Sequence, residues 1–172
     1  HLSTYASYHR DRRNIATHFF GIPMIVLGTS ALLSRPSWMI EGLPLSPAIL
    51  ATVGAALFYF LLDLRFGAVM TALFGLSAWA GATLAAESTA IWLGGALGLS
   101  VVGWVIQFVG HYYEGKKPAF VDDVAGFLVG PLFIVAEVAF ALGLRPELRQ
   151  QIEASAGPTF IRPLGSAARS GQ

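Results

Sequence analysis

Histidine is scarce in this chain, and three of its four copies lie at the edges of apolar runs. The four are His1, His9, His18 and His111. Three histidines together with one or two carboxylates suit a single first-row metal ion. The chain has no cysteine, so thiolate ligands and a cysteine nucleophile are excluded, and Fe(II), Zn(II) and Mn(II) are the candidate metals. An open-sided iron site activates O₂, whereas zinc with a bound water hydrolyses its substrate.

The spacing of His9 and His18 requires a break in the chain between them. Nine residues at about 100° each place the two rings on opposite faces of one straight helix. They can bind the same ion only if the chain turns between them. The stretch from Asp11 to Asn14 could supply that turn, with Asp11 or Asn14 capping the next helix. If Asn14 is the cap, His18 lies in the first helical turn, where the helix dipole favours the neutral imidazole that a metal needs. The alternative is that His9 lies in an exposed basic segment and His18 is an interfacial residue.

A polar stripe ends the fourth apolar run of the chain. Gln107, His111 and Glu114 are spaced four and three residues apart, so a helix places them on one face. Gly110 would let another backbone or a ligand approach beside His111. The alternative is a helix end in the lipid headgroup layer, where polar and aromatic residues collect. Gln107 lies inside the apolar length, which favours a shared polar site.

One ionisable residue lies inside the fifth apolar run. Glu137 is about thirteen residues into that run, which is near the middle of the bilayer if the run is a straight helix. Ionisable groups at this depth are costly and mark functional sites by default. Glu137 could therefore bind the metal, or it could stay protonated and hydrogen-bond within the protein.

Composition decides the class of protein that carries these residues. The chain is 55% hydrophobic and only 12% charged, about half the charged fraction of a soluble domain. A bilayer core about 30 Å thick needs roughly 20 apolar residues in a helix, and several runs approach that length. They cover residues 19–33, 45–62, 66–86, 91–109 and 124–144. We therefore predict an all-α fold, a polytopic transmembrane helical bundle with four to five spans or a re-entrant last helix.

Basic residues predict how the spans are oriented. An arginine cluster at residues 10–13 precedes the first run, and two lysines at residues 116–117 follow the fourth. The positive-inside rule places both clusters in the cytoplasm with four spans between them, so His9, His18 and His111 all lie at the cytoplasmic face. The arginines after the fifth run would lie outside the cytoplasm if that run crossed the whole membrane, which the positive-inside rule disfavours. Either the last run is re-entrant or interfacial, or an earlier run does not cross, and Gly130-Pro131, which could break the last run, favours the first explanation.

The pattern of the whole chain predicts one domain with a tail. Residues 1–150 form a single membrane-embedded helical domain, and residues 151–172, rich in Ser, Gly, Pro and Arg, form a flexible C-terminal tail. The net charge of +1 gives no reason to expect a nucleic-acid partner. There is no G-x-S-x-G elbow, no H-E-x-x-H motif and no glycine-rich phosphate loop. The residues by themselves therefore predict one metal site with apolar access, and they do not choose its reaction.

Two blocks of residues resemble a known family, the fungal 2-hydroxy fatty acid dioxygenases of α-oxidation and their bacterial relatives. The resemblance covers about Tyr5 to Leu144. The first block is His9, Asn14, His18 and Gly21-Ile22-Pro23; the second is Trp104, Gln107, Gly110-His111, Glu114 and Pro118-Ala119, followed by Pro131 and Glu137.

This resemblance implies an Fe(II)-dependent dioxygenase that shortens a 2-hydroxy fatty acid by one carbon with O₂ and without a 2-oxoglutarate co-substrate. A bacterial member would lie in the inner membrane, and a eukaryotic one in the endoplasmic reticulum. The implied ligands of Fe(II) are His9, His18 and His111.

The resemblance also implies roles for the other polar residues of the two blocks. Glu114 or Glu137 would be a further ligand or would support one, and Asn14 and Gln107 would orient ligands or the substrate headgroup. An arginine of the 10–13 cluster could pair with the substrate carboxylate.

Two alternatives stay open at this point. One is a zinc-dependent membrane lipid hydrolase that uses the same ligands. The other is a non-catalytic polytopic membrane protein, such as a channel, a transporter or an assembly partner, in which the histidines would be dispensable. The oligomeric state cannot be read from the sequence.

Overall fold

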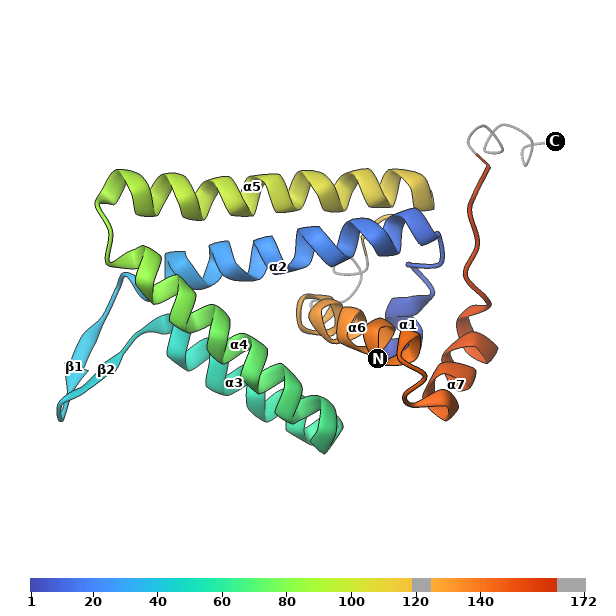
Figure 1. Cartoon of the computed structure of the whole chain (residues 1–172), viewed down its shortest axis with the longest axis horizontal. Helices are drawn as coiled ribbons and strands as arrows, with labels where there is room; N and C mark the ends of the chain where they lie inside the picture. Colours follow the sequence, from blue (N-terminus) through green and yellow to red (C-terminus); the bar gives the residue numbers. More distant parts are fainter. Residues whose placement is uncertain (119–124, 164–172) are drawn as a thin grey trace. The chain divides into compact units, whose positions relative to one another are not determined.

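The computed structural model describes residues 1–118 and 125–163, and these are mostly helical (Figure 1). A short hairpin of β1 (Trp38–Ile40) and β2 (Leu43–Leu45) separates α2 from α3. Ala119 of the second motif block, the start of the fifth run at residue 124, and the chain from residue 164 onward lie outside the described residues. The helices are α1 (Leu2–Ala6), α2 (Arg12–Ser34), α3 (Pro47–Leu62), α4 (Leu64–Ala85), α5 (Thr89–Glu114), α6 (Gly126–Ala141) and α7 (Pro146–Ala156).

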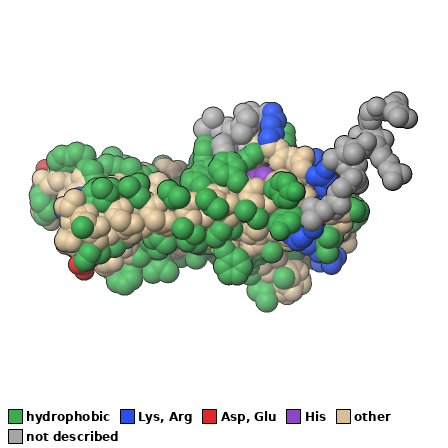
Figure 2. Space-filling model, turned by 90° about the horizontal axis from the view of Figure 1, so that it is seen from above, with side chains coloured by type: hydrophobic (Ala, Val, Ile, Leu, Met, Phe, Trp, Pro, Cys, Tyr) green, Lys and Arg blue, Asp and Glu red, His purple; other side chains and the backbone are tan. Residues whose placement is uncertain are grey.

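Three helices of the described chain, α2, α4 and α5, are long and apolar enough to cross a membrane. The helices α6 and α7 pass the same test together, and they count as a fourth span if the bent pair is one element. The helix α3 is apolar but has 16 residues, fewer than the roughly 20 that a bilayer core needs. Hydrophobic side chains cover much of the face drawn in Figure 2, as a lipid-facing surface requires. The predicted all-α, polytopic membrane fold is therefore confirmed, with a bent last element.

The bend does not lie at Gly130-Pro131, so the predicted break there is wrong. Pro131 lies inside α6, which continues to Ala141. Gly143, two residues after the end of α6, has a φ of +73°. The Gly143 N–H donates to the Phe140 carbonyl and the Leu144 N–H donates to the Ala139 carbonyl, which is the Schellman pattern of a helix C-terminus. Pro146 then starts α7 at an angle of 118° to α6.

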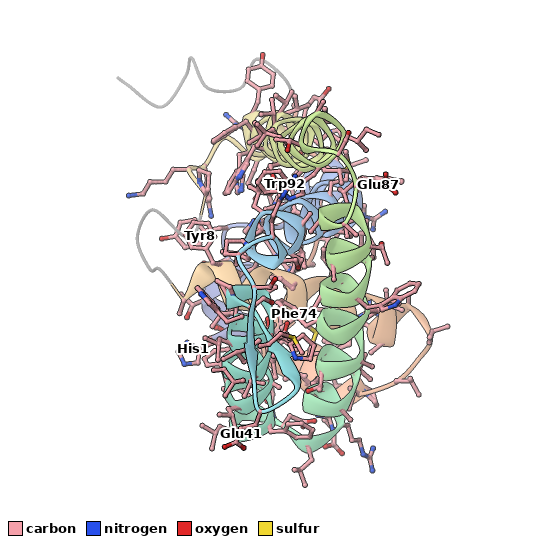
Figure 3. The ribbon with its side chains drawn as sticks, turned by 90° about the vertical axis from the view of Figure 1, so that its left-hand side faces the viewer. His1, Tyr8, Glu41, Phe74, Glu87 and Trp92 are labelled. Carbon is pink, nitrogen blue, oxygen red and sulfur yellow. The ribbon has the colours of Figure 1, made fainter. Side chains whose placement is uncertain are left out.

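The described chain forms two compact units, and residues 21–105 make up one of them. Within it α3 and α4 lie side by side, with Phe74 between the two helices in Figure 3. The Phe74 ring lies 5.7 Å from the ring of Tyr59. Asp63 ends α3 and caps α4, because its side chain accepts hydrogen bonds from the backbone N–H groups of Arg65 and Phe66. The predicted single domain over residues 1–150 stays a prediction.

Small residues bring helices of this unit close together. A Cβ at Gly81 would meet the backbone of Ser30 and Ala31, and a Cβ at Gly103 would meet the Gly21 carbonyl oxygen. At these two positions a larger side chain would force the helices apart.

The other unit contains residues 1–20 and 106–172. In it α1 contacts both α6 and α7, and Phe133 and Ile152 are buried at 0% and 2% exposure. The predicted flexible tail includes the end of α7 and Phe160, whose N–H donates to the Arg10 carbonyl and whose carbonyl accepts from the Arg12 N–H. Flexibility is a matter of motion, which this arrangement does not test, so it stays a prediction.

Candidate metal centre

The three motif histidines come together in a buried group. His9 lies in the link between α1 and α2, His18 lies in the second turn of α2, and His111 lies in the last turn of α5. Their exposed fractions are 1%, 2% and 7%. One ring nitrogen from each histidine can serve as a metal ligand, and these three nitrogens lie within 4.8 Å of one another. The predicted convergence of residues about ninety positions apart in sequence is therefore present in the structure.

The chain turns between His9 and His18 as their spacing required. The helix α1 ends at Ala6 and α2 begins at Arg12, so the turn lies slightly before the predicted stretch. Asp11 is the capping residue, because its Oδ1 accepts the Arg13 N–H at 2.9 Å. Hydrogen bonds from the Arg13 side chain hold the pKa of Asp11 at about 2, well below its ordinary value. The alternative with Asn14 as the cap and His18 in the first turn is wrong.

The spacing of the three rings fits one first-row ion. An ion about 2.1 Å from an imidazole nitrogen lies about 3.2 Å from the ring centroid, so rings at about 90° to 110° around one ion have centroids about 4.5 to 5.3 Å apart. The centroids are 4.4 Å apart for His9 and His18, 4.9 Å for His9 and His111, and 5.2 Å for His18 and His111. All three pairs meet at 70° to 77° rather than stacking. These separations and angles are compatible with three rings around one ion.

Hydrogen bonds fix which nitrogen two of the rings present. His9 Nδ1 lies 2.7 Å from the Tyr5 carbonyl oxygen, and His18 Nδ1 lies 2.8 Å from the Asn14 carbonyl oxygen. A carbonyl only accepts, so in the neutral rings Nδ1 carries the proton and Nε2 keeps its lone pair. Within the described chain His9 Nε2 and His111 Nδ1 are buried without a hydrogen-bond partner. Such orphaned lone pairs are what a metal ion would satisfy.

Burial keeps His9 in the neutral form. Desolvation lowers the pKa of His9 well below its ordinary value, and the neighbouring His18 lowers it further. The Tyr5 ring stacks on His9 at 4.1 Å, and the Phe133 ring lies 5.5 Å from it. Tyr5 was not among the predicted site residues, although its position one helical turn before His9 is a signal that could have identified it.

Glu114 binds the turn that carries His9. Its carboxylate accepts the Arg10 N–H at 3.0 Å, the Asp11 N–H at 2.8 Å and the Asn14 side-chain amide at 3.1 Å. Glu114 and His111 lie on the same face of the last turn of α5. The carboxylate therefore links the end of α5 to the His9 turn and to the first turn of α2.

Glu137 lies elsewhere in this unit. Its Oε1 is 3.8 Å from Nη2 of Arg10, a buried side chain whose Nε donates to the Ala6 carbonyl at 2.9 Å. The group of metal-capable residues in the described chain includes neither Glu114 nor Glu137. The possible roles of both carboxylates as metal ligands thus find no geometric support, and a supporting role stays a prediction.

Asn14 and Gln107 are both buried beside the histidine-bearing turns, at 0% and 4% exposure. Asn14 contacts two of these residues at once, because its backbone carbonyl accepts a hydrogen bond from His18 and its side chain donates to Glu114. Gln107 lies one turn before His111 on α5. Neither its Nε2 nor its Oε1 has a hydrogen-bond partner in the described chain.

Gly110 allows α5 to approach α2 at the site, as predicted for a close approach beside His111. A Cβ at Gly110 would overlap the Thr17 hydroxyl and the Asn14 side-chain oxygen.

We expect Gly110→Ala to lower the free energy of unfolding by about 1–3 kcal/mol, because the extra methyl overpacks this contact. The variant should also retain less metal after purification. Gly98→Ala is the matched control on the same helix, since a Cβ there meets nothing within 4 Å and removing a helical glycine is favourable. Thermal unfolding of both variants in detergent measures the difference, and equal melting temperatures would contradict the close contact.

The segment after α7 was also missed as a part of the site. Arg10 Nη1 donates to the Gly157 carbonyl at 3.0 Å, and the Arg162 N–H donates to Asp11 Oδ2 at 2.8 Å. These bonds hold the two residues that directly follow His9. Gly157 and Arg162 take part through backbone atoms, so the residue types of this segment do not reveal the two bonds.

Comparison with known proteins matches the two motif blocks to one family. The model of the family described as "2-hydroxy-palmitic acid dioxygenase Mpo1-like" matches residues 1–142. The chain belongs to the Mpo1-like family. The 2-hydroxy-palmitic acid dioxygenase MPO1 of Saccharomyces cerevisiae is 32% identical over 154 residues, which are 88% of this chain and 85% of that protein. The resemblance inferred from the sequence is therefore confirmed. No solved structure matches the chain.

The Mpo1-like match contains the whole histidine group, together with Asn14, Gln107, Glu114 and Glu137. It ends within the turn between α6 and α7. The Gly157 carbonyl that accepts from Arg10 and the Arg162 N–H that donates to Asp11 thus belong to a part of the chain beyond the family model.

Proposed function

We propose that this chain is an Fe(II)-dependent dioxygenase of fatty acid α-oxidation, which shortens a 2-hydroxy fatty acid by one carbon. The observation that carries the proposal is the buried group of His9, His18 and His111, whose ring spacing suits one first-row ion. Membership of the Mpo1-like family and the name of its yeast relative supply the reaction class.

The reaction balances without a further co-substrate. A 2-hydroxy acid and O₂ give the acid shortened by one carbon, CO₂ and water. The bond between C1 and C2 breaks, C1 leaves as CO₂, and C2 becomes the new carboxyl carbon. The substrate gives up four electrons and O₂ takes up four, so no reductant such as 2-oxoglutarate is required.

The three histidines would hold the ion through neutral nitrogens. When bound, Fe(II) supplies the redox chemistry that lets O₂ react with a closed-shell organic acid. Because His9, His18 and His111 bring no negative charge, a divalent ion there keeps its full charge and attracts an anionic ligand such as a carboxylate. Asn14 and Tyr5 orient His18 and His9 through their backbone carbonyls, and Glu114 fixes the turn between them.

The apolar helices suit the acyl chain of such a substrate. A fatty acid in the bilayer already lies among hydrocarbon, and its polar end reaches the membrane face where polar residues gather. The arginines at residues 12 and 13 and the lysines at residues 116–117 favour the cytoplasmic face for that end. The membrane would be the inner membrane of a bacterium or the endoplasmic reticulum of a eukaryote.

Product analysis tests this proposal. Detergent-purified protein is loaded with Fe(II) without oxygen and then given O₂ and 2-hydroxypalmitic acid. We expect a fatty acid one carbon shorter and about one O₂ consumed per molecule, with no such product from zinc-loaded protein. Failure to form the shorter acid in the iron-loaded protein would contradict the proposal. Release of fatty acid from phospholipid by the zinc form would favour the hydrolase instead.

A further inference from the structure

Gln107 is a buried amide whose side-chain nitrogen and oxygen both lack a partner. The residue is 4% exposed, and neither Nε2 nor Oε1 has a hydrogen-bond partner in the described chain. A primary amide offers two donors and one acceptor. Burying these groups unpaired is costly, so a native protein that does so needs a reason.

The position of Gln107 on α5 supplies a reason. Going back along α5, Glu114 contacts the Asn14 side chain, and Gly110 lies against Asn14 and Thr17. The two helices thus run in opposite directions at this contact. Gln107 lies one turn before Gly110 on the same face, so it faces the next turn of α2, which carries His18. The unpaired amide therefore borders the histidine group on the side away from Glu114.

The chemistry of a primary amide matches one kind of acid headgroup. A 2-hydroxy carboxylate has a hydroxyl donor and a carboxylate acceptor on adjacent carbons. The hydroxyl can donate to Oε1 while a carboxylate oxygen accepts from Nε2, so both unpaired atoms of Gln107 are satisfied by one ligand. An unsubstituted fatty acid satisfies only Nε2 and leaves Oε1 buried and unpaired.

We infer that Gln107 is the specificity-determining residue that selects acids bearing a 2-hydroxyl group. This inference rests on the proposed function, since it assigns the headgroup contact of that same substrate. The neutral amide is suited to the task, because a glutamate at this position would place a negative charge beside the substrate carboxylate.

The size of the selection follows from the cost of an unpaired buried group. A site built to hydrogen-bond a hydroxyl rejects the analogue that lacks it, because the buried partner is left without a hydrogen bond. For one acceptor we expect the 2-hydroxy acid to bind about 10- to 100-fold more tightly than the unsubstituted acid.

Equilibrium binding to the iron-loaded protein without oxygen tests the inference. The ligands are 2-hydroxypalmitic acid and palmitic acid, and the variants are Gln107→Leu, Gln107→Met and Gln107→Glu. In the Leu and Met variants we expect the preference for the 2-hydroxy acid to fall to about twofold or less, with iron content unchanged. Gln107→Glu should weaken binding of both acids.

Thermal unfolding without ligand gives an independent readout. An apolar side chain removes the unpaired amide, so we expect Gln107→Leu to raise the melting temperature by about 2–4 °C. If Gln107 had only a structural role, replacing it with leucine would lower the melting temperature instead. Thr71→Val is the control, since the Thr71 hydroxyl is also buried without a partner in the described chain but belongs to the other unit. That variant should leave the preference unchanged.

The outcomes separate this inference from the proposed function. A preference retained in both Gln107→Leu and Gln107→Met overturns the inference, as does a lower melting temperature or loss of iron in both variants. A wild-type protein that binds both acids equally also overturns it. In each case the formation of the shortened acid by wild-type protein still decides the proposed function by itself.

Discussion

Replacing His18 with alanine should remove iron and turnover together. Three neutral nitrogens are the only donors that the described histidine group offers, so losing one of three leaves a weak two-point site. Loss of an outer partner of a ligand already costs about 10- to 100-fold in metal affinity or activity. We expect the loss of a ligand itself to exceed that range, with iron falling from about one to below about 0.1 per chain.

Metal analysis of detergent-purified protein measures this, alongside the chain-shortening assay. His1→Ala is the matched control, because His1 is a histidine outside the group and its replacement should leave iron and turnover unchanged. His18→Ala protein that keeps about one iron per chain would show that the group is not the metal site. Folding of the variant is checked by its elution and its helical circular dichroism, since His18 lies in α2.

The histidine group could be predicted because it depends on topology and residue type. His18 and His111 lie at the ends of apolar runs, and four such runs between them predict that both lie on the same side of the membrane. A helix period of about 100° per residue also predicts a turn after His9. The precise place of that turn could not be predicted. Asp11 and Asn14 are both good capping residues, and only the contact between Asp11 and the Arg13 N–H decides between them.

The end of α6 shows the same limit. The sequence contains glycine and proline at residues 130–131 and again at residues 143–146, and both pairs are signals for a helix end. The helix ends near the second pair because the backbone N–H groups of Gly143 and Leu144 donate hydrogen bonds to carbonyls in the last turn of α6. Gly143 can take the left-handed conformation that this requires, whereas Pro131 only lacks an N–H within a helix that other bonds maintain.

The role of Glu114 was the harder part of the site to predict. Its spacing from His111 predicts a common face, but it does not reveal what that face meets. The partners are backbone N–H groups of Arg10 and Asp11, more than a hundred residues earlier in the chain. Backbone groups have no side-chain signature, so a buried glutamate near histidines was interpreted as a possible ligand.

The contacts of Glu114 predict a large effect of its replacement. We expect Glu114→Ala to lower the free energy of unfolding by about 3–5 kcal/mol, because it leaves buried N–H groups of the His9 turn without an acceptor. Iron affinity should fall about 10- to 100-fold, since His9 and His18 lose the group that fixes their turn. Glu114→Gln should be intermediate, because the amide keeps one acceptor oxygen and adds a donor that faces other donors.

Glu153→Gln is the matched control for these measurements. Glu153 accepts a hydrogen bond from Arg149 at 2.8 Å, but both side chains are well exposed, and exposed pairs contribute little. Iron titration and thermal unfolding of the three variants therefore separate the two kinds of glutamate. If Glu114→Ala lost iron completely while unfolding like the wild type, the carboxylate would be a ligand rather than a support. A stability loss together with partial loss of iron is what a residue that fixes the His9 turn produces, because such a residue acts on the metal only through the histidines that it positions.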